Sequence, residues 1–298
     1  MHQGDVLLLG HGTVDNLDDL PPFLANIRRG RSAPPELVEE LRRRYVAIGG
    51  SPLLRISREL AAALERAIGA RVHLAMRFWH PFAKDVLREV GPSGGRTLRV
   101  IPLAPYSGPV YAGEMRALAE EARAAGLEPP ALACAPSWGT EPLLLDGFAD
   151  RLRAALAALA ETRRRAAHVF FTAHSLPLSV IRQGDPYPEE VRAAAEAVAF
   201  RAGLENPWRV VYQSQGATAD PWLGPSVREG LREIADKGAI DIVFCPIGFL
   251  SDHIEILYDL DVEARAEAER AGVSYHRTES LNASPALVAA IAAVAANL

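Results

Sequence analysis

Short apolar segments alternate along this chain with longer segments in which apolar residues recur at helical spacing. The short segments are rich in Val, Ile and Leu. Such alternation is typical of βα units, which build parallel sheets covered by helices on both faces. In the first half it predicts strands over 6–9, 72–76, 98–103 and 131–135, and helices over 35–48, 52–68, 82–90 and 114–125.

The second half repeats this pattern after a long helix, rich in Ala and Leu, that is expected over 141–164. Four further strands are expected over 168–172, 210–213, 240–245 and 273–276. We therefore predict an α/β fold of two doubly wound, Rossmann-like lobes, residues 1–145 and 146–298, each with a four-stranded parallel sheet. The two lobes are expected to flank a cleft, with ligands bound at the carboxyl ends of the strands.

Charge and cysteine content exclude several classes of function. The 32 Lys and Arg residues face 37 Asp and Glu residues, giving a formal net charge of -5, so no basic field is available to hold nucleic acid. The two cysteines, Cys134 and Cys245, each lie in an apolar, strand-like segment. We interpret them as reduced core thiols, because an iron–sulfur cluster would need four ligands.

The first residues lead directly into the first apolar segment, without a basic region, a long apolar stretch or a cleavage site. No apolar run approaches the roughly 20 residues that would span a bilayer. The sequence therefore predicts a cytoplasmic protein without a transmembrane segment.

Two histidines occupy equivalent positions at the end of the first strand of each half, in Gly10-His11-Gly12 and in Ala173-His174-Ser175. A single histidine at a strand end is more often a structural residue that only makes a hydrogen bond. Two at matching positions favour a role in the predicted cleft.

The segment over 251–263 combines apolar residues with carboxylates. If it is helical, Glu255, Asp259 and Glu263 recur at i, i+4 and i+8 and lie on one face, although like charges at that spacing destabilise a helix. A solvated acidic face is the usual explanation, but the apolar neighbours leave little of the segment for solvent. A divalent cation such as Fe²⁺, Mg²⁺ or Mn²⁺, held loosely or in transit, would account for the stripe better than structural zinc.

Six segments, in order, resemble the signature blocks of the ferrochelatase family, and the resemblance covers nearly the whole chain. They are Asn-Ile-Arg-Arg-Gly-Arg over 26–31, Arg-Tyr to Gly-Gly-Ser-Pro-Leu over 44–53, Met-Arg-Phe-Trp-His-Pro-Phe over 76–82, Phe-Thr-Ala-His-Ser-Leu-Pro over 171–177, Pro-Trp-Leu-Gly-Pro over 221–225 and the acidic segment over 251–261.

The resemblance implies that His174 and Glu255 form a catalytic pair at one face of a porphyrin. Iron insertion requires loss of two pyrrole N–H protons and arrival of a cation, so a base and a carboxylate that directs the metal are both needed. The sequence leaves open which of the two does which. Asp259 and Glu263 would extend the metal-binding set, formed by His174 and Glu255, into a path of carboxylates towards solvent.

Other matching positions imply porphyrin contacts. Arg28, Arg44 and Ser51 would bind propionate groups by charge-assisted hydrogen bonds. His11 would face the other side of the ring, either as an axial ligand to iron or in a packing role, and the two are evenly balanced. Tyr111 would join the propionate contacts, and Trp222 would pack against the ring or belong to the core. One departure from the family pattern occurs over 215–220, where a basic residue usual in the family is missing.

The resemblance thus implies a lyase of haem biosynthesis that inserts Fe²⁺, as substrate, into coproporphyrin III or protoporphyrin IX without an organic cofactor. It also leaves room for a transient haem-acceptor or biosynthetic partner. Two alternatives remain open. One is a cobalt or iron chelatase for sirohydrochlorin-type rings, because residues 7–13 also resemble the opening of those enzymes. The other is a non-catalytic haem or porphyrin carrier, which would have no use for the acidic stripe.

Overall fold

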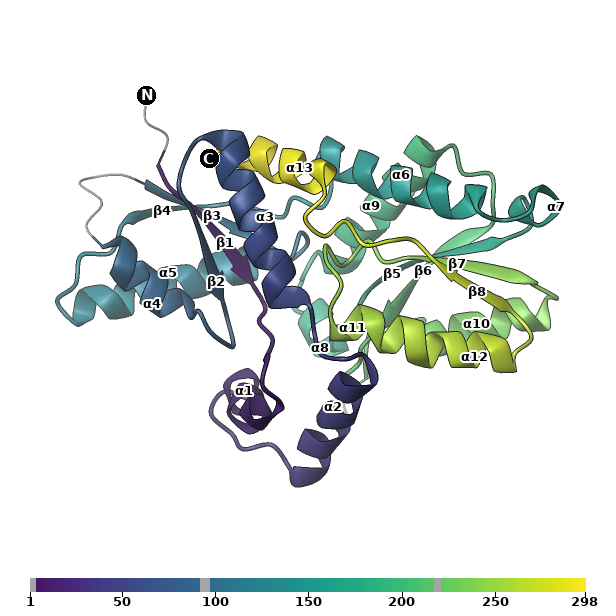
Figure 1. Cartoon of the computed structure of the whole chain (residues 1–298), viewed down its shortest axis with the longest axis horizontal. Helices are drawn as coiled ribbons and strands as arrows, with labels where there is room; N and C mark the ends of the chain where they lie inside the picture. The colour runs from purple at the N-terminus through teal and green to yellow at the C-terminus, as the bar shows by residue number, and fades with distance from the viewer. Residues whose placement is uncertain (1–3, 92–96, 217–220) are drawn as a thin grey trace. The chain divides into compact units, whose positions relative to one another are not determined.

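Two four-stranded sheets organise the chain, and all strand pairings within them are parallel. The computed structural model describes residues 4–91, 97–216 and 221–298 (Figure 1). The strand orders are β2-β1-β3-β4 and β6-β5-β7-β8. The strands are β1 (Val6–Gly10), β2 (Val72–Met76), β3 (Thr97–Pro102), β4 (Ala131–Cys134), β5 (His168–His174), β6 (Trp208–Gln213), β7 (Asp241–Cys245) and β8 (Ser274–Arg277). The predicted α/β class and the two four-stranded parallel sheets are confirmed.

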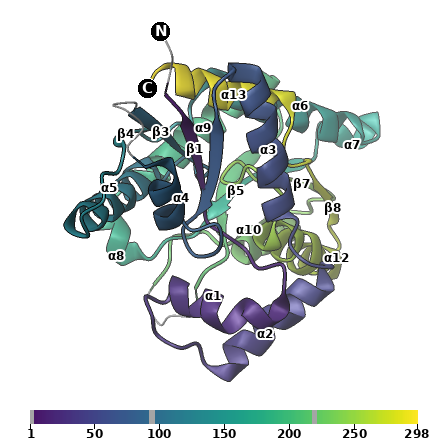
Figure 2. The same cartoon turned by 60° about the vertical axis from the view of Figure 1, so that its left-hand side comes forward.

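In the first sheet, alternate side chains of each strand point to opposite faces, and both faces are covered by helices. Leu7 and Leu9 of β1 pack against α4 (Ala83–Val90) and α5 (Gly108–Ala124). The other face is covered by α3 (Leu53–Ile68) and α13 (Pro285–Ala296), which contact each other. The 3₁₀ turn η1 (Leu17–Asp19) and the helices α1 (Leu20–Ile27) and α2 (Pro35–Ala47) follow β1 and lie away from the sheet (Figure 2).

The second sheet is covered in the same way. On one face, Phe170 and Phe244 pack with α10 (Val227–Asp236) and with the segment formed by α11 (Ile254–Leu257), η2 (Asp259–Ala264) and α12 (Arg265–Arg270). The other face carries α6 (Pro142–Ala157) and α9 (Tyr187–Ala202), which contact each other (Figure 1). The short helix α8 (Leu178–Ile181) follows β5.

The single helix predicted over 141–164 is wrong, because the structure divides it into α6 and α7 (Glu161–Arg164). The guanidinium of Arg164 folds back and donates to the carbonyl oxygens of Leu156, Ala157 and Leu159 at 3.0, 3.0 and 3.2 Å. The last carbonyls of a helix need such partners, so one side chain ends α6 from outside it.

By its internal contacts the chain divides into residues 1–138 with 282–298, and residues 139–281. Arg99 of β3 holds the returning C-terminal segment: its guanidinium is buried and donates to the carbonyl oxygens of Ala295 in α13, at 3.0 Å, and of Gly4, at 2.6 Å. The division predicted from the sequence assigned residues 282–298 to the second lobe, whereas the internal contacts group them with the first unit. The predicted cleft between lobes stays a prediction.

Some sequence-based expectations fall outside the described residues. Residues 1–3, at the start of the segment examined for an export signal, and residues 217–220, in the departure from the family pattern, are among them. Over 4–91, 97–216 and 221–298, no helix is both long enough and apolar enough to cross a membrane.

Candidate active site

His174 is the last residue of β5, a central strand of the second sheet. It lies in register with Gln213, the last residue of the neighbouring β6. Its backbone is fixed on both sides: the hydroxyl of Tyr187, at the start of α9, donates to the carbonyl oxygen of His174 at 2.9 Å, and the amide of Ser175 donates to the carbonyl oxygen of Gln213 at 2.7 Å. The imidazole therefore stands at the carboxyl end of the sheet, where α/β proteins bind ligands.

Glu255 contacts this imidazole from the acidic segment that follows β7. It lies in the first turn of α11, and its Oε2 is 2.8 Å from Nδ1 of His174. A carboxylate oxygen accepts, so Nδ1 carries the proton and donates. Nε2 of His174 makes no hydrogen bond with the described residues. The predicted meeting of the two side chains is present in the structure, and the ring is oriented with one nitrogen towards the acid.

The charges around His174 favour its protonated form. Burial opposes a charged imidazole, but the carboxylates of Glu255 and Asp259 outweigh it, so that the pKa of His174 is raised above its ordinary value. The side chain of His174 is 37% exposed and that of Glu255 is 25% exposed. Both side chains of the pair are thus accessible to solvent.

The end of β6 holds the acidic segment in place. The side-chain amide of Gln213 donates to the backbone oxygen of Glu255 at 2.5 Å, and the hydroxyl of the next residue, Ser214, donates to the carboxylate of Asp259. Ser214 has a φ of 59°, the left-handed conformation that ends the strand. The sequence analysis assigned Gln213 and Ser214 no role in positioning the acidic segment.

The spacing argument for Glu255, Asp259 and Glu263 assumed one regular α-helix, but the acidic segment does not form one. After the single turn of α11, η2 is a π-helix, in which the amide of Glu263 donates to the carbonyl oxygen of Tyr258 at 2.9 Å. A π turn is rare, wider than an α turn and frequent at functional sites. Repulsion among carboxylates at regular α-helical spacing disfavours that helix, and contacts from the strand ends hold the wider turn.

Glu263 lies further along η2 and is exposed. In the part of the chain that the structure describes, no group of three or more His, Cys, Asp and Glu side chains is arranged to hold a metal ion. The metal-directing roles of His174, Glu255, Asp259 and Glu263 therefore stay predictions.

A second histidine, His253, lies close enough to the pair to interact electrostatically with both Glu255 and His174. Its Nδ1 donates to the carbonyl oxygen of Ser251 at 3.0 Å, and its ring packs on Phe249 with centroids 5.2 Å apart. Burial lowers the pKa of His253, and the positive charge of His174 lowers it further, against the opposing effect of Glu255. The pKa values of the two neighbouring imidazoles are thus shifted in opposite directions, that of His174 upwards and that of His253 downwards.

The predicted porphyrin contacts of the first unit lie around β1 and the helices that follow it. His11 is exposed directly after β1, and its ring meets the edge of Phe78 with centroids 4.8 Å apart. Arg28 ends α1, and its Nε is buried without a hydrogen-bond partner among the described residues. Arg44, in the last turn of α2, donates from Nε to Glu40 at 2.9 Å. Ser51 accepts from the amide of Leu53 at 3.4 Å, ahead of α3.

The two predicted aromatic contacts lie in different surroundings. Tyr111 is 4% exposed within α5, in the core of the first unit, and the guanidinium of Arg77 stacks on its ring at 4.5 Å. Trp222 is half-buried in the second unit, where it pairs with Pro177 and packs over Gly216, and its Nε1 is buried without a partner among the described residues. Their roles at a porphyrin stay predictions.

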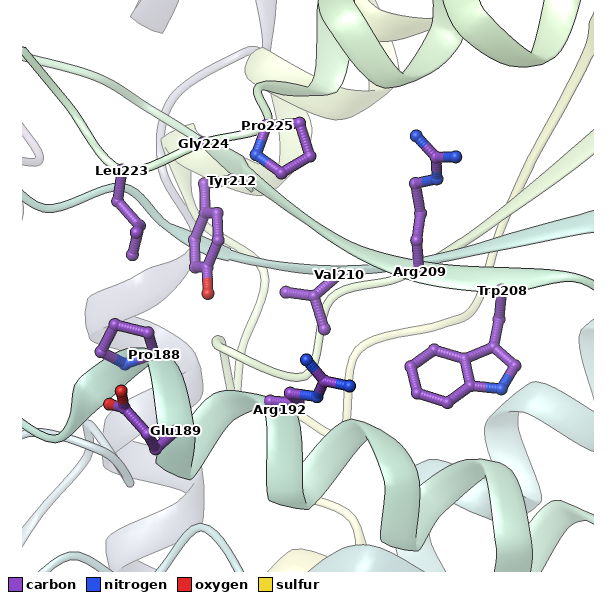
Figure 3. A pocket seen from close by; sticks show the side chains of 10 residues that line it. All are labelled: Pro188, Glu189, Arg192, Trp208, Arg209, Val210, Tyr212, Leu223, Gly224 and Pro225. Atoms are coloured by element: carbon purple, nitrogen blue, oxygen red, sulfur yellow. The ribbon is translucent and has the colours of Figure 1, made fainter.

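A cavity of about 660 Å³ lies elsewhere in the second unit, between α9, β6 and residues 223–225 (Figure 3). Trp208, Val210 and Tyr212 of β6 form one wall, and Glu189 and Arg192 of α9 form another. None of the predicted site residues lines it. Burial and the nearby charge of Glu189 raise the pKa of Tyr212 to about 12, so its hydroxyl stays protonated.

Solved structures of chelatases resemble this chain in fold. SirB from Bacillus subtilis with Fe³⁺ matches it with a TM-score of 0.58 at 14% identity, covering 99% of this chain and 96% of that one. CbiX, described as the terminal enzyme of sirohaem biosynthesis in denitrifying bacteria, matches with a TM-score of 0.55 at 15% identity, covering 98% of each chain. At such identities the likeness shows the fold alone.

Sequence comparison gives a closer relationship. The coproporphyrin III ferrochelatase of Anoxybacillus flavithermus is 36% identical over 98% of this chain and 95% of its own length. The ferrochelatase of Herpetosiphon aurantiacus is 35% identical over 95% of both. The family model described as Ferrochelatase matches residues 4–298. The chain, with its strand-end histidine held by a carboxylate of a π-helical acidic segment, belongs to the ferrochelatase family.

Proposed function

We propose that this protein is a lyase that inserts Fe²⁺ into a porphyrin in haem biosynthesis, and that its porphyrin is coproporphyrin III, with protoporphyrin IX as the close alternative. Family membership and the names of relatives at about 35% identity support the reaction. Five of the relatives that match more than nine-tenths of the chain are named coproporphyrin III ferrochelatases, which favours that substrate. Iron is the substrate here, and no organic cofactor is required.

The hydrogen bond between His174 and Glu255 is the observation on which the proposed chemistry depends. Glu255 engages Nδ1 of the imidazole at 2.8 Å and so leaves Nε2 as the nitrogen that meets a reacting group. In its neutral form, His174 accepts a pyrrole proton at Nε2, and the carboxylates of Glu255 and Asp259 stabilise the resulting imidazolium. The second pyrrole proton leaves to solvent, and the charge of the arriving cation replaces that of the two protons.

The acidic residues beyond Glu255 would provide the path for cations or protons. Asp259 is oriented by Ser214, and Glu263 is exposed one turn further along η2. A partly desolvated Fe²⁺ favours oxygen and imidazole ligands, so carboxylates in sequence could pass it inward without holding it tightly.

The carboxylates of the porphyrin need cationic donors, and the first unit offers them. Arg28 has a buried Nε without a partner among the described residues, which is the donor chemistry that a propionate would satisfy. Arg44 and Ser51 would add a second charge and a hydroxyl. His11 keeps both roles open, as axial ligand or packing residue, and Trp222 and Tyr111 would support the ring or its substituents.

Anaerobic Fe²⁺ titration of the purified protein with coproporphyrin III, protoporphyrin IX and sirohydrochlorin, followed by absorbance, tests these assignments together. We expect fastest metallation of coproporphyrin III. If no ring is metallated faster than in buffer, the protein is not a chelatase, and the result favours the alternative of a non-catalytic haem or porphyrin carrier. If sirohydrochlorin alone is metallated, the ring assignment is wrong.

Location and partners complete the proposal. We place the reaction in the cytoplasm, with a transient haem-acceptor or biosynthetic partner that takes up the product. Fractionation of cells, with the protein detected by antibody, tests the location, and recovery in the membrane fraction would contradict it.

A further inference from the structure

One guanidinium in the second unit contacts the acidic segment on both sides of Glu255. Arg277, the last residue of β8, donates from Nε and Nη2 to the two carboxylate oxygens of Asp261, both at 2.8 Å. Its Nη1 lies 3.6 Å from the carboxylate of Asp252. Asp252 precedes α11 and Asp261 lies inside η2, so the segment between them is held at both ends by one side chain.

The surroundings of Arg277 leave it little freedom. Its side chain is 14% exposed, and Nη1 also donates to the carbonyl oxygen of Thr278 at 2.8 Å. The hydroxyl of Ser280 donates to Asp252 at 2.7 Å. Tyr275, also in β8, donates from its hydroxyl to Asp261 at 2.9 Å. A planar fork bound to both oxygens of a carboxylate fixes direction as well as distance, which a lysine ammonium does not.

Arg277 binds the acidic segment from one edge of the second sheet, and the residues at the end of β6 bind it from the other edge. β6 and β8 are the two outer strands. Gln213 and Ser214, at the end of β6, bind the backbone of Glu255 and the carboxylate of Asp259. The acidic segment is therefore bound from both outer strands, and two of its bound residues, Asp259 and Asp261, lie in the first half of η2.

We propose that Arg277 is a positioning residue for iron insertion, which holds the π turn so that Glu255 and Asp259 stay beside His174. This inference rests on the proposed function for its catalytic consequence. Without the fork, Asp252 and Asp261 lose their common partner and repel each other, and the π turn is no longer held from β8. Glu255 and Asp259 then shift relative to the end of β5.

The test compares R277Q and R277K with R228Q as matched control. Arg228 of α10 pairs with Glu267 of α12 at 2.6 Å, so it holds the same stretch of chain from outside the site. We expect R277Q to lower kcat for iron insertion between about 10- and 100-fold, because small misplacements of catalytic groups carry such costs. Porphyrin Kd should change less than about twofold, and R277K should recover only part of kcat, since it restores charge but not the fork.

Hydrogen exchange of the backbone amides of Val262 and Glu263, which both donate to Tyr258, gives a readout that needs no catalysis. Exchange there should accelerate in R277Q and stay at the wild-type rate in R228Q, whose kcat should also be unchanged. Wild-type kcat in R277Q, or full recovery in R277K, would overturn the proposed role, as would unchanged exchange. If the wild-type protein inserts no iron, the proposed function fails, while the exchange data still decide whether Arg277 holds the turn.

Discussion

Gly248, which follows β7, offers a direct test of how tightly the position of His174 is set. Its amide donates to the carbonyl oxygen of Thr172 in β5 at 2.9 Å. A Cβ added at Gly248 would lie 2.6 Å from Cα and 2.7 Å from Cβ of Ala173, the residue before His174. Both atoms are fixed to the backbone of β5, so no flexible side chain can move aside. The substitution Gly248→Ala must therefore displace the end of that strand.

The displacement can be estimated from these contacts. To reach an ordinary contact of 3.4 Å from 2.6 Å, the two backbones must separate by about 0.8 Å. If His174 moves with Ala173 away from Glu255, the Nδ1–Oε2 distance of 2.8 Å grows to about 3.6 Å, which is no longer a hydrogen bond. We expect a loss of about 1–3 kcal/mol in the free energy of unfolding from overpacking. The same shift should lower kcat between about 10- and 100-fold.

Urea unfolding and anaerobic iron insertion, measured on the same preparation, separate these two effects. Gly230→Ala is the control: its Cβ would lie 2.9 Å from the ring of Phe170 and 3.0 Å from Val211, in the core rather than at the site. It should also change stability, with about 1 kcal/mol of the strain offset by the better helix propensity of alanine, and leave kcat within about twofold. The reasoning is refuted if Gly248→Ala keeps wild-type kcat while it is destabilised.

Three further outcomes follow from the site and the core. Glu255→Gln should lower the pKa of His174 in an NMR titration of the iron-free protein, and an unchanged pKa would show that the carboxylate does not charge the ring. Since the folded-state pKa is raised, this pair stabilises the native state below the unfolded pKa of about 6.5. The difference in unfolding free energy between wild type and Glu255→Gln should then shrink as pH rises through the folded pKa. Gln213→Leu should lower kcat and cost about 1–3 kcal/mol of stability in urea unfolding, because the carbonyl of Glu255 loses its donor. Cys245, whose pKa burial raises to about 12, should react with iodoacetamide only as fast as the protein unfolds.

The strands could be predicted because each is a short apolar segment in a sheet buried on both faces. Every predicted strand is present, and 72–76 has the observed bounds of β2. The positions of His174 and Glu255 in their motifs also indicated that the two side chains meet. Local pattern suffices where burial alone decides the structure.

Features that depend on distant partners could not be predicted in the same way. Arg164 ends α6 by binding carbonyls behind it, and Arg99 holds a helix from the far end of the chain. Each depends on where a single guanidinium points, and neither leaves a periodic signal in the sequence. The anchors of the acidic segment, Gln213, Ser214 and Arg277, are missed for the same reason.

The π turn illustrates why the site depends on anchors rather than on helix propensity. Carboxylates at 255, 259 and 263 disfavour the regular helix that would align them, and α11 with η2 is too short to be stable alone. Burial of Ile256 and Leu260 against the sheet holds the apolar side of the segment. Hydrogen bonds from β6 and β8 then decide which turn forms on its polar side. Repulsion among these carboxylates, which form the proposed path for a cation, is opposed by contacts from both outer strands. Loss of either contact should therefore disturb the geometry at His174 before it unfolds the sheet.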